Sequence, residues 1–330
     1  MIHLRLPDNS HRRLPFYLAM EEWAARRLPA ADYFFTWRVS PTVIFGRNQR
    51  PDVELDREYC RAHGIQFYRR KSGGGCVYAD LDNIMLSFIT ASADVESTFA
   101  RYTAAVTDML RRAGVDAHAT GRNDIVIDGR KVSGAAFYRL PGRSIAHSTM
   151  LYSTDVEHMS RAITPSRSKL ACKGVSSVES HITTLSRYLD MDIESFERFI
   201  SDTLCDSVML LSTDNVREIE QIERPYYDPA WIEGRRCQGT ITRMRRVDGV
   251  GELAFELGFD RDRRIASINL TGDFFLTGDL DGLLDRLKGC ATDRDSLSRA
   301  LSDCRVPDVI RGLNRDTLAG LLAEVAAEPI

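Results

Sequence analysis

Residues 70–78, RKSGGGCVY, place three consecutive glycines between two apolar segments that are typical of β-strands. A turn without side chains leaves its backbone N–H groups free to close around an anion. Arg69 and Arg70, at the start of the turn, would add planar donors for a phosphate or a carboxylate. A tight strand connection with both arginines in solvent explains a triple glycine equally well. The stretch therefore predicts two strands and a candidate anion-binding loop.

A second segment, residues 121–134 (GRNDIVIDGRKVSG), predicts a β-hairpin with polar groups at both ends. Asp128-Gly129 supplies the positive φ values of a type I′ turn, and the flanking Ile and Val residues favour strands. Lys131 would neutralise charge on an α-phosphate and a carboxylate oxygen, and Asn123 and Asp124 would hold a magnesium ion or a ribose. The alternative for this lysine is an exposed hairpin position, because most lysines are solvated.

Five segments in chain order resemble the lipoate-protein ligases of the type that carry a C-terminal accessory domain. They are residues 41–49 (PTVIFGRNQ), 69–88, 121–138, 147–151 (HSTML) and 169–178 (KLACKGVSSV). The second resembles the lipoate-binding loop of that family and the strand behind it, and the last resembles the loop that folds over the adenylate. The resemblance extends from about residue 14 to the C-terminus.

The resemblance implies an α+β protein with two domains. Residues 1–245 would form a mixed β-sheet catalytic domain of the biotin/lipoate-protein ligase type, with a linker at about 224–237. Residues 246–330 would form a small α+β C-terminal accessory domain, which we interpret as a structural lid because it lacks a glycine loop and a cluster of candidate catalytic groups.

The implied reaction has two steps. Lipoate and ATP give lipoyl-adenylate and pyrophosphate, and a lysine of a lipoyl carrier domain then attacks to form an amide. The implied carriers are the acyltransferase subunits of 2-oxoacid dehydrogenase complexes and the carrier protein of the glycine-cleavage system. Because the attacking lysine belongs to the carrier, the chain needs no nucleophile of its own.

Site residues are implied by matching positions. ATP or the adenylate would contact Arg70, Gly75, Cys76, Val77, Tyr78, Asn123, Asp124, Lys131, Lys173 and Gly174, and lipoate would contact Arg70, Ser72, Gly73, Gly74, Gly75, Lys131 and His147. Lys131 is the implied catalytic residue, because a mixed anhydride places negative charge where a fixed cation stabilises it most. Asp124 is the candidate ligand for Mg²⁺.

The chain departs from the family pattern at several positions. Ala79 and Asp82 stand where a histidine and a glycine are usual, and Glu179 begins a segment that lacks two positive charges. Ser148 stands where glycine is common, which predicts a slightly narrower acyl pocket. None of these residues carries the implied reaction, so we interpret them as subfamily variation.

Two other functions compete with the ligase. Cys76 and Cys172 lie in the best-matching motifs, and a cysteine in an acyl-handling site can form a thioester, as in the cysteine-dependent octanoyl- and lipoyl-transferases of the same fold. Cysteine also serves as a small apolar filler. A non-catalytic lipoyl-binding protein is the third interpretation. Lys131, the Asn123-Asp124 pair and the Lys173 loop favour the ligase over both.

His147 is interpreted as an orienting or core histidine, because no other His, Cys or carboxylate lies at zinc-like spacing.

Composition agrees with a soluble enzyme. A net charge of −3 over 330 residues disfavours a general nucleic-acid-binding protein. Seven scattered cysteines without a CxxC pair indicate a reduced, cytoplasmic setting. The sequence shows no secretion signal and no run of about 18 apolar residues, so no membrane span is expected. We expect a monomer.

Hydrophobic periodicity predicts alternating helices and strands. The expected helices cover 14–28, 96–113, 193–205, 214–223, 279–288, 293–303 and 315–326. The expected strands cover 33–37, 42–45, 65–68, 76–78, 84–90, the hairpin at 124–138, 144–152, and a meander at about 238–246, 252–259 and 264–271.

Overall fold

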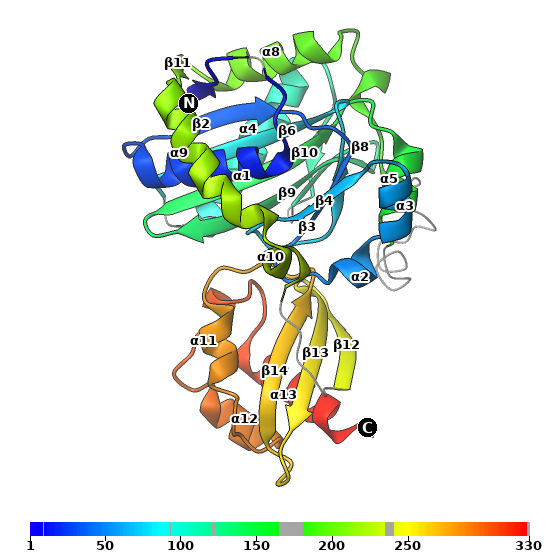
Figure 1. Ribbon diagram of the computed structural model, residues 1–330, viewed down its shortest axis with the longest axis vertical. Coiled ribbons are helices and arrows are strands. Elements are labelled where there is room, and N and C mark those ends of the chain that lie inside the picture. The colour runs from blue at the N-terminus through cyan, green and yellow to red at the C-terminus, as the bar shows by residue number, and fades with distance from the viewer. Residues whose placement is uncertain (9, 93, 121–122, 165–180, 235–240, 329–330) are drawn as a thin grey trace. The chain divides into compact units, whose positions relative to one another are not determined.

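A computed structural model describes the whole chain except residues 9, 93, 121–122, 165–180, 235–240 and 329–330. The chain divides into two compact units, which contain the elements labelled in Figure 1. Unit 1 comprises Met1–Phe45, Pro51–Arg70 and Cys76–Ile232, and unit 2 comprises Gly46–Arg50, Lys71–Gly75 and Glu233–Ile330. Two short loops from the N-terminal part of the sequence therefore belong with the C-terminal residues.

Unit 1 is built on two β-sheets. The strands are β1 Ile2–Arg5, β2 Tyr33–Trp37, β3 Thr42–Phe45, β4 Gln66–Arg69, β5 Val77–Ala79, β6 Asn83–Thr90, β7 His118–Ala119, β8 Asp124–Ile127, β9 Arg130–Leu140, β10 Arg143–Leu151 and β11 Ser207–Leu210. The larger sheet has the order β11-β1-β2-β6-β10-β9-β8-β7, and the smaller has the order β4-β3-β5. Both contain parallel and antiparallel pairs, so the predicted mixed-sheet α+β class is confirmed.

The helices before residue 234 are α1 Leu14–Arg27, α2 Pro51–Glu54, α3 Arg57–Ala62, α4 Val95–Arg112, α5 Val156–Ala162, α8 Ile193–Leu204, α9 Thr213–Glu223 and α10 Pro229–Glu233, with 3₁₀ turns η1 Leu185–Arg187 and η2 Arg224–Tyr227. Four of them cover the two faces of the larger sheet, whereas α3 and α5 contact the smaller sheet. Helices α1 and α9 pack together, and α1 contacts β6 and β10; α4 and α8 pack together on the other face (Figure 1). In the part of the chain that the structure describes, every helix is too short or too polar to span a bilayer.

The predicted hairpin is present. Asp128 and Gly129 connect β8 and β9 with φ values of 50° and 72°, as a type I′ turn requires. The helix predicted at 14–28 is α1, which has a proline in its first turn and Arg26-Arg27 in its last turn, where cations favour the helix dipole. The short strands β1 and β11, which form one edge of the larger sheet, were not predicted.

The segment expected to be a linker is largely folded. Residues 224–227 form η2, whose Tyr226 is 1% exposed in the core of unit 1. Its ring lies edge-on to that of Trp231, with the centroids 6.2 Å apart. Proline and tyrosine interrupt the helical pattern here because the chain turns into the core instead of leaving it. Residues 235–237 of the expected linker lie outside the described residues.

Unit 2 contains the predicted meander and three helices. Strands β12 Ile241–Val247, β13 Gly251–Phe259 and β14 Ile265–Gly272 form an antiparallel sheet, and α11 Leu280–Asp285, α12 Arg294–Ala300, η3 Val306–Asp308 and α13 Arg315–Ala327 complete the unit. Its core joins alternate residues of β13, such as Leu253, Phe255 and Leu257, to the apolar residues of α13. The boundary expected at residue 245 falls inside β12.

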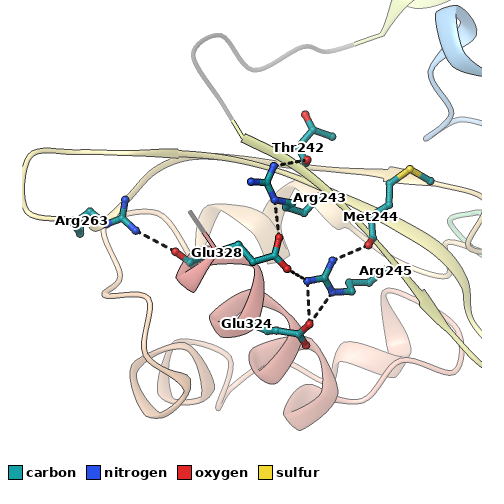
Figure 2. Close-up of polar contacts among 8 residues, drawn as sticks. Thr242, Arg243, Met244, Arg245, Arg263, Glu324 and Glu328 are labelled. Carbon is teal, nitrogen blue, oxygen red and sulfur yellow. Dashed lines mark hydrogen bonds and ion pairs between the residues drawn. The ribbon is translucent and has the colours of Figure 1, made fainter. Parts of the chain in front are cut away.

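Ion pairs join β12 to the end of α13 (Figure 2). Arg243 Nε lies 2.6 Å from Glu328, and Arg245 contacts both Glu324, at 2.9 Å, and Glu328. Arg263 donates to the carbonyl of Ala326 at 3.1 Å. The arginines thus compensate two carboxylates at the negative end of the helix and one of its terminal carbonyls.

Arg245→Ala is expected to lower the melting temperature of unit 2 at pH 7 but to have little effect in acid. Arg245 holds the pKa of Glu328 below its ordinary value of 4.5. The pair's contribution is therefore present above that pH and is lost as the pH falls through the lowered pKa. Calorimetry from pH 7 to about pH 2 checks this, with Lys288→Ala as an exposed-pair control. A difference in melting temperature that does not change with pH would contradict it.

Candidate functional site

Lys131 lies on β9 with its ammonium held by a carboxylate. Lys131 Nζ is 2.7 Å from Asp124 Oδ1, and both side chains are less than one-fifth exposed. Asp124 pairs across the ladder with Gly134, and Gly134 pairs with Thr149 of β10. Paired residues of neighbouring strands share a face, so the structure places a fixed cation and its counter-ion on one face of the sheet.

Hydrogen bonds fix the backbone on both sides of the Lys131–Asp124 pair. Asn123 exchanges backbone and side-chain bonds with Ala135: its carbonyl accepts from Ala135 N at 2.8 Å, and its Nδ2 donates to Ala135 O at 3.2 Å. The carbonyl of Lys131 accepts from Thr183 N at 2.8 Å. Both strand ends that carry the candidate residues are therefore fixed by hydrogen bonds.

His147 belongs to a buried polar chain on the same face. Its Nδ1 lies 3.0 Å from both carboxylate oxygens of Glu21, which is fully buried on α1. Ser87 donates to Glu21 at 2.6 Å, and Trp37 Nε1 donates to Ser87 at 2.9 Å. Sequence analysis missed Glu21. A carboxylate on an otherwise apolar helix stripe is the signal that would have found it, because buried charges need partners.

Arg70 is buried beside this chain. It donates to the carbonyl of Ile44 at 3.0 Å. Burial lowers the pKa of Arg70 to about 10, against the opposing effects of Cys76 and Glu21, so the guanidinium stays charged at neutral pH. A buried guanidinium that stays charged is a candidate donor for an anionic group.

The neighbouring Arg69 does not share this role, which corrects the prediction of paired arginine donors. Its guanidinium donates to the carbonyls of Trp231 at 2.8 Å and Ile232 at 2.9 Å, and it lies over the ring of Phe45, 4.9 Å from the centroid. Trp231 in turn donates to the carbonyl of Arg69 at 3.1 Å. Arg69 therefore fastens α10 to β4.

The triple-glycine loop is part of unit 2. Gly74 N donates to the carbonyl of Phe274 at 3.1 Å, and Ser72 accepts from Arg47 N at 2.9 Å. A Cβ on Gly73 would lie 2.5 Å from the carbonyl oxygen of Phe274. Glycine is thus required here for close backbone packing, and the amide of Gly74 is already used, which corrects the expectation that all the loop amides face an anion.

The remaining predicted residues fall in three places. Val77 and Tyr78 lie on β5, and Cys76 lies just before it. Burial raises the pKa of Tyr78 above its ordinary value, so its hydroxyl stays neutral. Lys173, Gly174 and Cys172 lie outside the described residues.

Ser148 and its neighbour His147 lie on opposite faces of β10, and the narrower acyl pocket stays a prediction. The two are neighbours on β10, so their side chains point to opposite faces. Ser148 Oγ lies 2.6 Å from the hydroxyl of Tyr102 on α4.

A magnesium ion at Asp124 would have one protein carboxylate. Among the residues that the structure describes, no group of three or more His, Cys, Asp or Glu side chains is arranged to hold a metal ion. Mg²⁺ commonly binds through one or two carboxylates together with nucleotide phosphates and waters. Asp124 fits an ion that arrives with a nucleotide better than a resident metal.

Comparisons with known proteins identify the family of the chain. Residues 14–205 match the family model of the lipoyl protein ligase A/B catalytic domain, and residues 238–322 match that of the bacterial lipoate protein ligase C-terminus. Lipoate–protein ligase 1 of Staphylococcus aureus is 30% identical over 316 residues, which cover 93% of this chain and 95% of that protein. Lipoate-protein ligase LplJ of Bacillus subtilis is 32% identical over 310 residues, 90% of each.

Solved structures share the fold. P. falciparum LipL1, determined in complex with lipoate, superposes with a TM-score of 0.77 over 99% of each chain at 18% identity. A bi-partite lipoate protein ligase of Thermoplasma acidophilum, studied with its E2 lipoyl domain, is 25% identical with a TM-score of 0.62, over 72% of this chain and 98% of that one. The chain therefore belongs to the lipoate–protein ligase family and is an enzyme with both the catalytic and the C-terminal domain of that family.

Proposed function

We propose that the chain activates lipoate with ATP and then transfers the lipoyl group to a lysine of a lipoyl carrier domain. The observation that carries the proposal is the Lys131–Asp124 pair at 2.7 Å on the β8–β9 hairpin. In the first step a lipoate carboxylate oxygen attacks the α-phosphorus of ATP, the bond to the β-phosphate breaks, and pyrophosphate leaves. The charge that accumulates on the α-phosphate and the carboxyl oxygen requires a fixed cation, which Lys131 supplies.

The other predicted site residues have supporting roles in this proposal. Arg70, buried and charged, is assigned to an anionic group of either substrate. Gly75, Cys76, Val77, Tyr78, Asn123, Lys173 and Gly174 are assigned to ATP or the adenylate, and Ser72, Gly73, Gly74 and His147 are assigned to lipoate. Asp124, with Mg²⁺, is assigned to hold the phosphates through the ion that accompanies ATP.

The second step needs no nucleophile from the chain. The neutral amine of a carrier lysine attacks the acyl carbon of lipoyl-adenylate, AMP leaves, and an amide forms as the amine loses a proton. The proposed carriers are lipoyl domains of 2-oxoacid dehydrogenase complexes and the glycine-cleavage carrier protein. A monomeric, cytoplasmic enzyme remains our prediction.

We propose that the chemistry belongs to the part predicted as residues 1–245 and the accessory role to the part predicted as 246–330, with the boundary moved to residue 232, where unit 1 ends. The two family-model matches, 14–205 and 238–322, support such a division of labour. An adenylate is vulnerable to water, so the accessory domain is proposed to limit its hydrolysis.

Pyrophosphate release from ATP tests the function. The purified chain should release pyrophosphate when lipoate is added, without a carrier present, and should then lipoylate an added lipoyl domain. A cysteine-dependent transferase would transfer an acyl group without ATP, and a binding protein would bind lipoate without pyrophosphate release. Either result would overturn the proposal.

Cys76→Ala is expected to retain most carrier lipoylation. The substitution changes the side-chain volume little, so any loss should reflect packing alone. The cysteines at 60, 76, 205, 290 and 304 are free thiols. Burial raises the pKa of Cys60 to about 11, which makes its thiol a poor nucleophile. Cys60 is therefore a suitable control position for the same substitution. If Cys76→Ala binds both substrates but never modifies the carrier, and the parent forms a thioester, the transferase interpretation is correct.

A further inference from the structure

The side chain of Lys131 lies over Gly134, the glycine of β9, and occupies the space that a side chain at position 134 would need. A Cβ built on Gly134 would be 2.6 Å from Lys131 Cε, closer still to Nζ, and 3.4 Å from Asp124 Oδ1. Carbon atoms in ordinary contact are about 3.5–4.0 Å apart, so no other residue at position 134 tolerates the observed path of the lysine. We propose that Gly134 is a positioning residue, whose missing side chain creates the space in which the Lys131 ammonium is held against Asp124.

A bulge in β9 explains why two residues three apart share this space. In a regular strand Lys131 and Gly134 would point to opposite faces. The ladder, however, pairs Asp124 with Gly134, Ile125 with Ser133, and Val126 with Lys131. One residue of β9, Val132, is therefore extra, and a bulge of this kind re-aims the side chains that follow it. Because of the bulge, Lys131 points to the same face as Asp124 and Gly134.

The remaining space around Gly134 is closed by polar groups. Its amide donates to Thr149 Oγ1 at 3.2 Å, and Asp124 lies across the ladder. Backbone strain does not explain the glycine, because its φ lies outside the left-handed region. The need for glycine at this position therefore comes from the lysine side chain.

A methyl group at position 134 would push the end of a flexible side chain aside, so its main effect should be on catalysis. This inference rests on the proposed role of Lys131 and deepens it. We expect Gly134→Ala to slow lipoate-dependent pyrophosphate release by about 10–100-fold, because a displacement of about 1 Å at a reacting centre has effects of that order. Gly320→Ala is the matched control, since a Cβ there meets only Arg294 Nε at 3.9 Å, and it should keep the parental rate.

A double-mutant cycle separates positioning from a general structural effect. If Gly134 acts through Lys131, then Gly134→Ala should cause no further loss of rate in a Lys131→Ala background. A structural defect would instead lower the rate by the same factor in both backgrounds, and that result would overturn the inference. Parental activity in the single Gly134→Ala variant would overturn it as well.

Thermal unfolding gives a second readout that does not depend on activity. Gly134→Ala should lower the melting temperature of the parent but leave it unchanged or raised in the Lys131→Ala background, where the clash is absent and alanine favours the strand over glycine. A single variant that fails to fold while the double variant folds would show the same coupling. Equal shifts in both backgrounds would contradict the geometry. If the parent itself releases no pyrophosphate, the proposed function fails, and the melting temperatures still decide the placement of Lys131.

Discussion

We expect Lys131→Ala to slow lipoate-dependent pyrophosphate release by at least ~10²-fold while the protein remains folded, because one preorganised electrostatic group is removed from a developing charge. The ammonium is held 2.7 Å from Asp124, so it need not reorganise when substrate arrives. The measurement is a single-turnover rate of lipoyl-adenylate formation, with circular dichroism as the test of folding.

Lys288→Ala serves as the matched control for this substitution. Lys288 also forms a lysine–aspartate pair, with Asp285 at 2.7 Å, but both side chains are at least half exposed and lie in unit 2. Its loss should leave the rate of adenylate formation unchanged. If the Lys131 and Lys288 variants have the same rate, the assignment of Lys131 is wrong.

Glu21→Ala should lower the free energy of unfolding by about 3 kcal/mol, because it removes a fully buried carboxylate from its hydrogen-bond partners. The substitution removes the carboxylate that lies 2.6 Å from Ser87 Oγ and 3.0 Å from His147 Nδ1. Both groups then lose this hydrogen-bond partner. Buried groups without partners retain the cost of their lost hydration. Urea unfolding, followed by tryptophan fluorescence, measures the change.

Glu218→Ala provides the comparison. Its carboxylate also accepts from a tryptophan, Trp23 Nε1 at 2.9 Å, and pairs with Arg27, but it is 47% exposed. Water can replace those partners, so the expected loss is about 1 kcal/mol or less. If the two variants are equally destabilised, the buried hydrogen bonds that connect Trp37, Ser87, Glu21 and His147 contribute no more to stability than the exposed contacts of Glu218.

Local signals in the sequence predicted the hairpin and its lysine well. An Asp-Gly pair forces the backbone of the turn whatever surrounds it, so the positions of β8 and β9 could be predicted from a few residues. The importance of Gly134 could not be predicted in this way. It depends on one extra residue in β9, which shifts the pairing register between β8 and β9. A glycine inside a strand pattern suggests a bulge or a close approach, but it does not say which side chain approaches.

The two arginines illustrate the limit of local sequence. Arg69 and Arg70 are adjacent and chemically identical, and both are buried. Arg69 donates to carbonyls of Trp231 and Ile232, more than 160 residues away, whereas Arg70 donates to the carbonyl of Ile44 and interacts electrostatically with Glu21 and Cys76. Only the packing of distant segments distinguishes a structural arginine from a candidate binding residue.

The hydrogen bond from Gly74 to Phe274 can form only late in the synthesis of the chain. Its two residues are about 200 positions apart, and ribosomes add roughly 5–20 residues per second. The glycine loop therefore leaves the ribosome roughly 10–40 s before the segment that accepts its amide exists. During that interval β3, β4 and β5 can pair, and Ser72 can accept from Arg47 N, but the acceptor of the Gly74 amide is still missing. We expect nascent chains released before residue 274 to be cleaved by protease within residues 71–75, and full-length chains to resist cleavage there.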